Sequence, residues 1–221
     1  MHKDDDYVRQ LESFIQKILK PIRDVPFRVV VKGWTGYDVI PFDSENAEHS
    51  KLLENLKQVA VKAGLDINKN GINKKRSNEV GNAVEAYVRE ALNDYGCKAT
   101  TPRGKSGKRK AAGYPDIMFY FDDKPYYLEC KTYNINTFYS KQRSFYFSLS
   151  DDPKINCDAV HLLLSYEIEV ENQLFKCRHY KILSLEDLLV DLKLEFNSDN
   201  RRLYSGNGAR VLAEGDIIHS A

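Results

Sequence analysis

Two charged side chains stand in an otherwise apolar stretch of the sequence, residues 125–131. They are Glu129 and Lys131, with a single residue between them. Side chains alternate between the two faces of a β-strand, so Glu129 and Lys131 would share one face while their neighbours pack on the other. A buried charge is costly unless it has a partner or binds a metal. The pair therefore marks a candidate chemical site.

A third charged residue, Asp116, begins the preceding apolar stretch, residues 116–121. The polar turn at residues 122–124 would join the two stretches into a β-hairpin and bring Asp116 beside Glu129. Two carboxylates with an open coordination sphere suit Mg²⁺, which keeps several waters and takes phosphate oxygens. We therefore name Asp116 and Glu129 as candidate metal ligands. Cys130 is included with them, although its side chain is expected on the packed face.

These residues also carry a resemblance to a known family. Pro115 and Asp116, followed by Glu129, Cys130 and Lys131, resemble the PD-(D/E)xK signature of the nuclease superfamily that includes most type II restriction endonucleases. The separation between the two halves is what a short hairpin needs. Both halves lie on apolar stretches, and a helical segment with acidic residues precedes them, as is common in this family. The resemblance implies a restriction-endonuclease-like core.

The resemblance implies a role for each residue in a Mg²⁺-dependent DNA endonuclease. Asp116 and Glu129 would hold Mg²⁺ against the scissile phosphate. Lys131 would orient or help deprotonate the attacking water and would offset phosphate charge. The helix before the hairpin offers a third carboxylate. We favour Glu85 over Glu79 there, because Glu85 lies close to the same helix face as Asn78 and Asn82; the alternative is an ordinary exposed glutamate.

A basic segment leads into Pro115. Residues 103–110 contain five basic residues and no acid, although the formal net charge of the whole chain is only +1. Clustered Lys and Arg favour contact with a nucleic-acid backbone. A solvated surface loop is the alternative reading. The candidate phosphate contacts are Lys105, Lys108, Arg109 and Lys110.

A polar segment with interleaved aromatic residues follows the Glu129–Lys131 strand. Its side chains are of the kinds that read donors and acceptors on base edges and contact phosphates. The alternative is a polar loop with aromatic residues packed beneath it. The candidate DNA-binding residues in this segment are Asn134, Asn136, Lys141, Gln142 and Arg143.

Hydrophobic periodicity predicts the elements that must position this site. The order of these elements indicates an α/β fold with a mixed central β-sheet flanked by helices, following a mainly helical N-terminal region. Helices are predicted at residues 6–20, 47–64, 78–94 and 185–196. Strands are predicted at residues 98–101, 116–121, 125–131, 159–166 and 174–182, with a strand or extended segment at 27–32.

The domain boundary is expected near residue 70, where a polar segment begins. Residues 1–70 would form the mainly helical region, and residues 71–221 the nuclease core with a C-terminal tail. At 42% apolar and 29% charged residues, the composition is that of a folded globular protein. We expect a cytoplasmic protein with four free cysteines, since no secretion signal, membrane span or CxxC pair is visible.

The sequence thus favours a type II restriction endonuclease acting on double-stranded DNA. Within the same chemistry, a junction resolvase or repair nuclease remains an alternative. A DNA-binding module without catalysis, whose carboxylates are structural, is an alternative of another class. Because one such site cuts one strand, we also expect a homodimer on DNA. The two N-terminal helices, residues 6–20 and 47–64, are its candidate interface, and packing onto the sheet is their alternative role.

Overall fold

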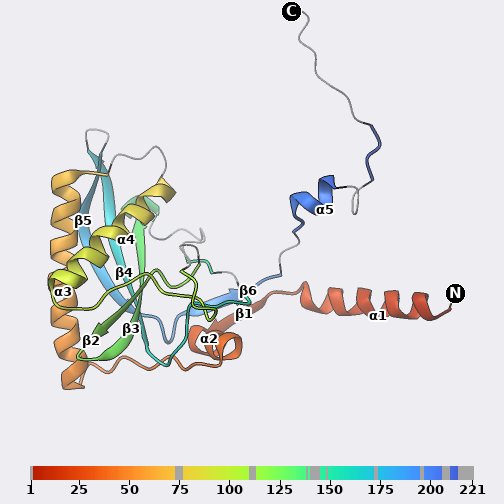
Figure 1. Ribbon diagram of the computed structural model, residues 1–221, viewed down its shortest axis with the longest axis horizontal. Helices are drawn as coiled ribbons and strands as arrows, with labels where there is room; N and C mark the ends of the chain where they lie inside the picture. The colour runs from red at the N-terminus through yellow and green to blue at the C-terminus, as the bar shows by residue number, and fades with distance from the viewer. Residues whose placement is uncertain are drawn as a thin grey trace, which may run out of the picture. The chain divides into compact units, whose positions relative to one another are not determined.

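The computed structural model describes residues 2–72, 77–109, 113–137, 139, 145–147, 149–171, 174–194, 197–205 and 210–213, with the side chains of 2–5, 77–82 and 137 left out. Two compact units make up the chain (Figure 1). The first holds residues 1–23 and 191–221, and the second holds residues 24–190. These units are defined by contacts within the chain. The expected domain boundary near residue 70 stays a prediction.

A four-stranded mixed sheet forms the centre of the second unit. Its order is β2 (Ile117–Phe121), β3 (Lys124–Tyr133), β4 (Val160–Glu171) and β5 (Leu174–Ser184). The β2–β3 and β4–β5 pairs are antiparallel, and the β3–β4 pair is parallel. The predicted α/β class with a mixed central sheet is therefore confirmed.

The predicted hairpin joins β2 to β3. Ile117 pairs with Leu128 and Phe121 pairs with Lys124, so the turn is made by the two aspartates between the strands. Asp122 and Asp123 have φ angles of 47° and 60°. Aspartate tolerates this left-handed conformation better than most residues, which suits a tight turn.

Two long helices cover one face of the sheet (Figure 1). They are α3 (Ala47–Asn70) and α4 (Ser77–Asp94). The Asn46 side chain caps α3 by accepting from the backbone N–H groups of Glu48 and His49. Leu52, Leu56 and other apolar residues of the helices pack against buried strand residues in one hydrophobic cluster. Both predicted helices are confirmed, although α3 is longer than predicted.

The opposite face of the sheet packs against α2 (Phe27–Thr35). The prediction of a strand or extended segment at residues 27–32 was wrong. Phe27, Val30 and Val31 are buried and share one helix face, and Gly36 ends the helix at a φ of 82°. Tertiary burial of this apolar face therefore outweighs the β-preference of a valine-rich run.

The predicted helix at residues 185–196 was also wrong. Leu185 to Leu188 form a turn closed by a backbone hydrogen bond of 3.0 Å, and β6 (Leu189–Leu192) follows. This short strand pairs with β1 (Ile22–Pro26) in a separate two-stranded sheet. Residues 195 and 196 lie outside the described residues. The apolar residues of this segment have helical spacing, but backbone pairing with β1 makes it a strand despite that periodicity.

The strand predicted at residues 98–101 is present only as an isolated bridge. Thr100 and Met118 exchange two backbone hydrogen bonds of 2.8 and 3.0 Å. The Lys98 N–H also donates to the Tyr120 carbonyl at 3.3 Å, so the segment runs beside β2 without forming a regular strand. Residues 98–101 connect α4 to the basic segment.

The first unit contains α1 (His2–Ile18) and α5 (Asn200–Tyr204). The predicted N-terminal helix is confirmed and ends at Ile18, shortly before Pro21. Its apolar side chains at Tyr7, Leu11 and Phe14 are exposed. Among the described residues, no helix is long and apolar enough to cross a membrane. The four cysteines are free, as predicted.

Candidate active site

The β2–β3 hairpin brings the predicted chemical residues together. The strand pairing stops at Ile117 and Leu128, and β3 continues beyond it. Asp116 lies just before β2, and its Oδ2 accepts a hydrogen bond of 2.9 Å from the backbone N–H of Cys130. Asp116 therefore lies beside the Glu129–Lys131 segment, as the sequence predicted.

Glu129 and Lys131 form a close ion pair on the face of β3 that also carries Tyr127. Lys131 Nζ lies 2.5 Å from Glu129 Oε1. The Glu129 side chain is only 4% exposed, whereas that of Lys131 is 30% exposed. The second carboxylate oxygen of Glu129, Oε2, is buried and has no hydrogen-bond partner among the described residues. No hydrogen bond from the described residues therefore offsets the cost of burying this oxygen.

The electrostatics of this pair reflect burial and a crowded negative charge. Burial and the charge of Asp116 together raise the pKa of Glu129 to about 7, against an opposing effect of Lys131. Burial lowers the pKa of Lys131, but the carboxylates of Glu129 and Asp116 outweigh it and raise that pKa overall. Lys131 Nζ also lies 5.9 Å from the centre of the Phe145 ring. Lys131 therefore stays protonated near neutral pH.

Glu85 is a third acid whose charge interacts with the site. It lies on α4, where its side chain is 20% exposed and pairs with Arg89 at 2.8 Å. Burial raises the pKa of Glu85, the charge of Asp116 raises it further, and Arg89 and Lys154 oppose the shift. The choice of Glu85 as the helix carboxylate stays a prediction. The side chain of Glu79 lies outside the described residues.

Cys130 presents its backbone, not its thiol, to the site. The thiol belongs to the core cluster under α3 and α4, on the opposite face from Glu129. Burial and the neighbouring carboxylates raise the pKa of this thiol well above its ordinary value. A thiolate ligand is therefore disfavoured. The N–H and C=O of one strand residue point to the same side, so the Cys130 carbonyl lies on the edge that faces Asp116.

The donor set can be tested for its fit to Mg²⁺. No cluster of three His, Cys, Asp or Glu side chains suited to a metal occurs among the described residues. Mg²⁺ does not need such a cluster, because it commonly binds through one or two carboxylates and completes its shell with water and phosphate oxygens. Asp116 and Glu129 supply two, and the uncompensated Oε2 of Glu129 would gain from a cation. The residues fit Mg²⁺.

Sequence reasoning missed Lys154, a buried lysine next to the site. Its side chain is 2% exposed, and its Nζ donates to the carbonyl oxygens of Gly113 and Pro115 at 2.6 and 2.9 Å. A lysine after Asp152 and Pro153 reads as part of a polar surface loop. No local pattern shows that the fold encloses it.

His161 is a fully buried histidine in the core of the second unit. Its Nδ1 lies 2.6 Å from the Tyr114 hydroxyl, and both residues are buried. Burial lowers the pKa of His161 to about 3, so the ring is neutral. Its imidazole ring contacts the rings of Phe27 and Tyr127 in the core beneath α2.

The basic segment forms a small hairpin. Arg103 and Arg109 bridge each other, and the N–H of Gly104 donates to the Lys108 carbonyl at 2.9 Å. Lys105, Lys108 and Arg109 are exposed, as phosphate contacts must be. Lys110 lies outside the described residues.

Only part of the second predicted DNA-binding segment is described. Asn134 and Asn136 are exposed at the end of β3, and the backbone N–H of Asn136 donates to Asn134 Oδ1 at 2.8 Å. The other candidates of this segment, Lys141, Gln142 and Arg143, lie outside the described residues.

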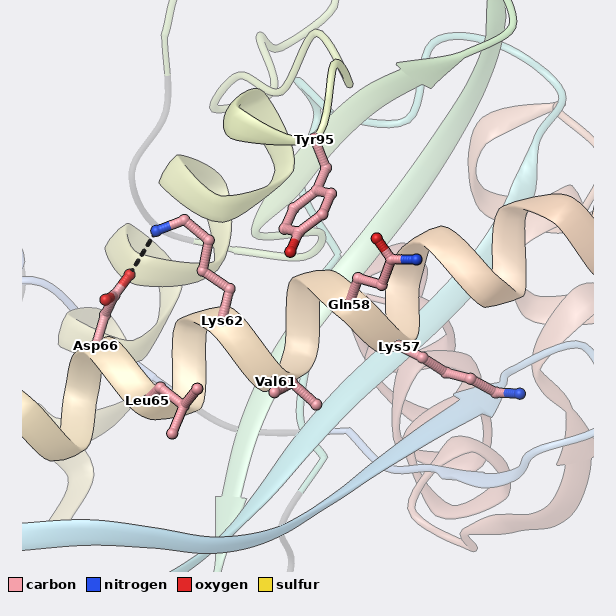
Figure 2. A pocket seen from close by; sticks show the side chains of 7 residues that line it. All are labelled: Lys57, Gln58, Val61, Lys62, Leu65, Asp66 and Tyr95. Carbon is pink, nitrogen blue, oxygen red and sulfur yellow. Dashed lines mark hydrogen bonds and ion pairs between the residues drawn. The ribbon is translucent and has the colours of Figure 1, made fainter.

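A hollow of about 520 Å³ lies away from these residues, on the outer side of α3 (Figure 2). Exposed Val61 and Leu65 line it together with Tyr95 at the end of α4. Lys62 crosses one end and pairs with Asp66 at 2.8 Å and with Asp94 at 3.1 Å. None of the predicted site residues lines the hollow. Most of its lining residues lie on α3, one of the two helices that the sequence suggested as a dimer interface.

The raised pKa of Glu129 predicts how stability depends on pH in metal-free buffer. The folded-state pKa of about 7 exceeds the ordinary value of 4.5, so the folded state binds this proton more tightly than the unfolded state. The resulting stabilisation is complete below pH 4.5 and is lost as the pH rises through about 7. Glu129→Gln should remove this component, on the order of 1–3 kcal/mol.

Urea unfolding of both proteins across this pH range, with EDTA present, measures the difference. Glu48→Gln is a matched control, because Glu48 is an exposed glutamate that pairs with Lys124. It should follow the wild type at every pH. Parallel curves for wild type and Glu129→Gln would show that Glu129 titrates normally in the folded protein.

Comparison with known proteins adds two findings. Residues 21–207 match the family described as Type II restriction enzyme MjaV family. A curated relative from Methanocaldococcus jannaschii, named Type II restriction enzyme MjaV, is 38% identical over 217 residues. The match covers 91% of this chain and 94% of that relative. The matched family region contains the whole hairpin, the basic segment and α4.

Proposed function

Since the chain belongs to the Type II restriction enzyme MjaV family and is a restriction endonuclease, we propose that it hydrolyses phosphodiester bonds of a specific double-stranded DNA sequence with Mg²⁺. One observation carries the assignment of the active site. Asp116, Glu129 and Lys131 converge at the end of the β2–β3 hairpin, where a buried carboxylate oxygen lacks a partner. The resemblance of the sequence to the PD-(D/E)xK nucleases, which implies such a site, supports the proposal.

Each residue of the site has a distinct role in this proposal. Asp116 and Glu129 bind the metal through their carboxylates, and Cys130 contributes its backbone carbonyl. When bound, Mg²⁺ supplies positive charge that polarises the scissile phosphate. Glu85 acts as an outer acid that adds negative charge near Asp116.

Lys131 acts as a hydrogen-bond donor. Its raised pKa keeps the ammonium charged, so it orients the attacking water and offsets the charge that grows on the phosphate, but does not itself remove a proton. Its partial exposure leaves it accessible to the substrate, while Glu129 Oε1 holds it in place at 2.5 Å. The ammonium is therefore oriented before DNA arrives.

Digestion of a plasmid of known sequence tests this function. With Mg²⁺ we expect discrete fragments whose mapped ends share one sequence, and with EDTA we expect none. Smearing, or cleavage of branched DNA only, would indicate a structure-specific nuclease. DNA binding without any cleavage would indicate a binding module and would refute the proposed chemistry.

The exposed basic hairpin is proposed to contact the DNA backbone. Changing Lys105, Lys108, Arg109 and Lys110 together to Gln should weaken binding to all DNA sequences. The slope of log affinity against log salt should become shallower by roughly 0.9 for each lost phosphate contact. Fluorescence anisotropy with a labelled duplex in Ca²⁺ measures both quantities.

A matched control changes two lysines near the β2–β3 turn, Lys51 on α3 and Lys124 at the start of β3. Lys51 and Lys124 are exposed, pair with Asp122 and Glu48 respectively, and flank the β2–β3 turn. Their replacement by Gln should leave the salt slope unchanged. If the basic-hairpin variant also keeps the wild-type slope, these residues form a solvated loop and do not contact phosphates.

We further propose that two copies assemble on DNA through α1. Tyr7, Leu11, Phe14 and Ile18 follow one another at spacings of four, three and four residues, the pattern of a helix-packing seam. The first three are exposed. Three aspartates, residues 4–6, lie near the start of the helix and Lys17 lies in its last turn, so an antiparallel pair of α1 helices would bring these opposite charges near each other.

Light scattering with a specific duplex and Ca²⁺ should therefore give two subunits per duplex. Replacing Leu11 and Phe14 by Asp should reduce this to one subunit, because a charge would enter the seam. Exchanging Glu12 and Gln16, on the same helix, for Ala is the control. A wild-type mass of one subunit per duplex at all protein concentrations would refute the homodimer.

A further inference from the structure

Lys154 is a buried cation that holds the chain next to Asp116. Its ammonium donates to the carbonyl oxygens of Gly113 and Pro115, which precede Asp116 in the chain. Burying an ammonium costs several kcal/mol unless good hydrogen bonds compensate it, and an apolar side chain of similar volume would fill the same space without that cost. A role in fixing the position of Asp116 accounts for a lysine at this place.

The same short segment also holds the basic hairpin. Asp152 Oδ1 accepts from the backbone N–H of Ser106 at 2.7 Å, and Oδ2 accepts from the Ser106 hydroxyl at 2.9 Å. The N–H of Lys105 donates to the Pro153 carbonyl at 3.0 Å. The backbone of Lys105 and the backbone and hydroxyl of Ser106 are therefore attached directly to residues 152 and 153.

The contact between the two segments is tight. Gly104 passes so close to the Asp152 carboxylate that a Cβ at residue 104 would clash with it. Only glycine permits this approach. The basic hairpin thus packs directly against the segment that precedes Lys154.

We propose that residues 152–154 connect the basic hairpin to the metal site, with Lys154 as the positioning residue that sets Asp116 for metal binding. The inference rests on the proposed function, since it takes Asp116 as a metal ligand. In this arrangement a phosphate bound by Lys105 and its neighbours is placed at a fixed position relative to Asp116. Lys154 itself touches neither DNA nor metal.

Lys154→Met tests the positioning role, because methionine keeps the length of the side chain and removes its donors. We expect the single-turnover cleavage rate to fall about 100-fold, as a misplacement of about 1 Å can cause. The affinity of the DNA-free protein for Mn²⁺, followed by electron paramagnetic resonance, should fall by about 10–100-fold. DNA affinity in EDTA should stay near the wild-type value.

Lys176→Met is the matched control. Lys176 also donates to a backbone carbonyl, that of Asn68, but lies on β5 away from the site. It should bind Mn²⁺ and cleave DNA like the wild type. Asp152→Ala is the complementary variant, which releases Ser106 and should chiefly weaken DNA binding and raise KM, whereas Lys154→Met should chiefly lower the rate.

Several results would overturn the inference. It fails if Lys154→Met binds Mn²⁺ and cleaves DNA as the control does. If Lys154→Met does not fold, Lys154→Gln, whose amide keeps a donor, should fold and show the same losses at smaller size. If Lys154→Gln also fails to fold, Lys154 serves the core alone and the inference is wrong.

Asp116→Asn distinguishes failure of this inference from failure of the proposed function. An inactive Asp116→Asn together with a normal Lys154→Met refutes the positioning role and leaves the active site intact. Normal cleavage by Asp116→Asn refutes the active site, and the inference falls with it.

Discussion

Asp116→Asn should abolish DNA cleavage while leaving DNA binding and the fold almost unchanged. The substitution removes a negative charge from the proposed metal site, and metal-assisted charge stabilisation is worth several kcal/mol. At a factor of ten for each 1.4 kcal/mol, the rate should fall by about 10³-fold or more. Asparagine still offers a side-chain oxygen to the Cys130 N–H, so the end of the hairpin should remain intact.

Single-turnover cleavage in Mg²⁺ and anisotropy in Ca²⁺ measure the two effects separately. Ca²⁺ occupies oxygen sites in a looser geometry and so permits binding without fast chemistry. Asp123→Asn is the matched control: Asp123 is an exposed aspartate in the hairpin turn, and asparagine suits its positive φ. Normal cleavage by Asp116→Asn would show that the active site lies elsewhere.

Lys131→Met should lower the cleavage rate by about 10²–10³-fold, the loss expected when a donor to a developing negative charge is removed. It should also change the pH dependence. Lys131 lowers the pKa of Glu129, so its removal leaves that pKa higher than about 7 and the carboxylate protonated over a wider pH range. Protonated Glu129 binds a cation poorly. The residual activity of Lys131→Met should therefore keep increasing at pH values above the wild-type optimum.

Rate measurements across pH at saturating Mg²⁺ provide this comparison, with circular dichroism to follow folding. Lys124→Met, at the other end of β3, is the control and should keep the wild-type profile. The fold should survive, because Glu129 can take up a proton when its partner is lost. If Lys131→Met is unfolded at every pH, Lys131 is primarily a structural partner of Glu129 and its assigned role is wrong.

The hairpin could be predicted because its signals are local. An apolar run marks each strand, and Asp122 and Asp123 supply the turn, so the pairing that carries Asp116 to Glu129 follows from the sequence. The α2 helix could not be predicted in this way. Its valines favour a strand, and only the buried surface beneath it, which includes Tyr114 and Tyr127, decides for a helix.

Lys154 illustrates a second limit of sequence reasoning. Lysine is rarely buried, and the polar residues before it indicate a surface loop. Its position depends on the carbonyls of Gly113 and Pro115, which lie far from it in the sequence. The error at β6 has the same origin, since its pairing partner, β1, is distant in the sequence.

The unequal lengths of β2 and β3 have a consequence for solubility. Beyond Leu128, no described strand pairs with β3 on the side where β2 ends, and the Cys130 N–H there is occupied by Asp116. Unpaired strand edges recruit strands from other molecules, and charged groups at such edges discourage this. We therefore expect Asp116 also to discourage intermolecular strand addition at this edge. Apolar replacements at this residue should promote aggregation, so inactivity in a cell-based screen would confound lost chemistry with lost soluble protein.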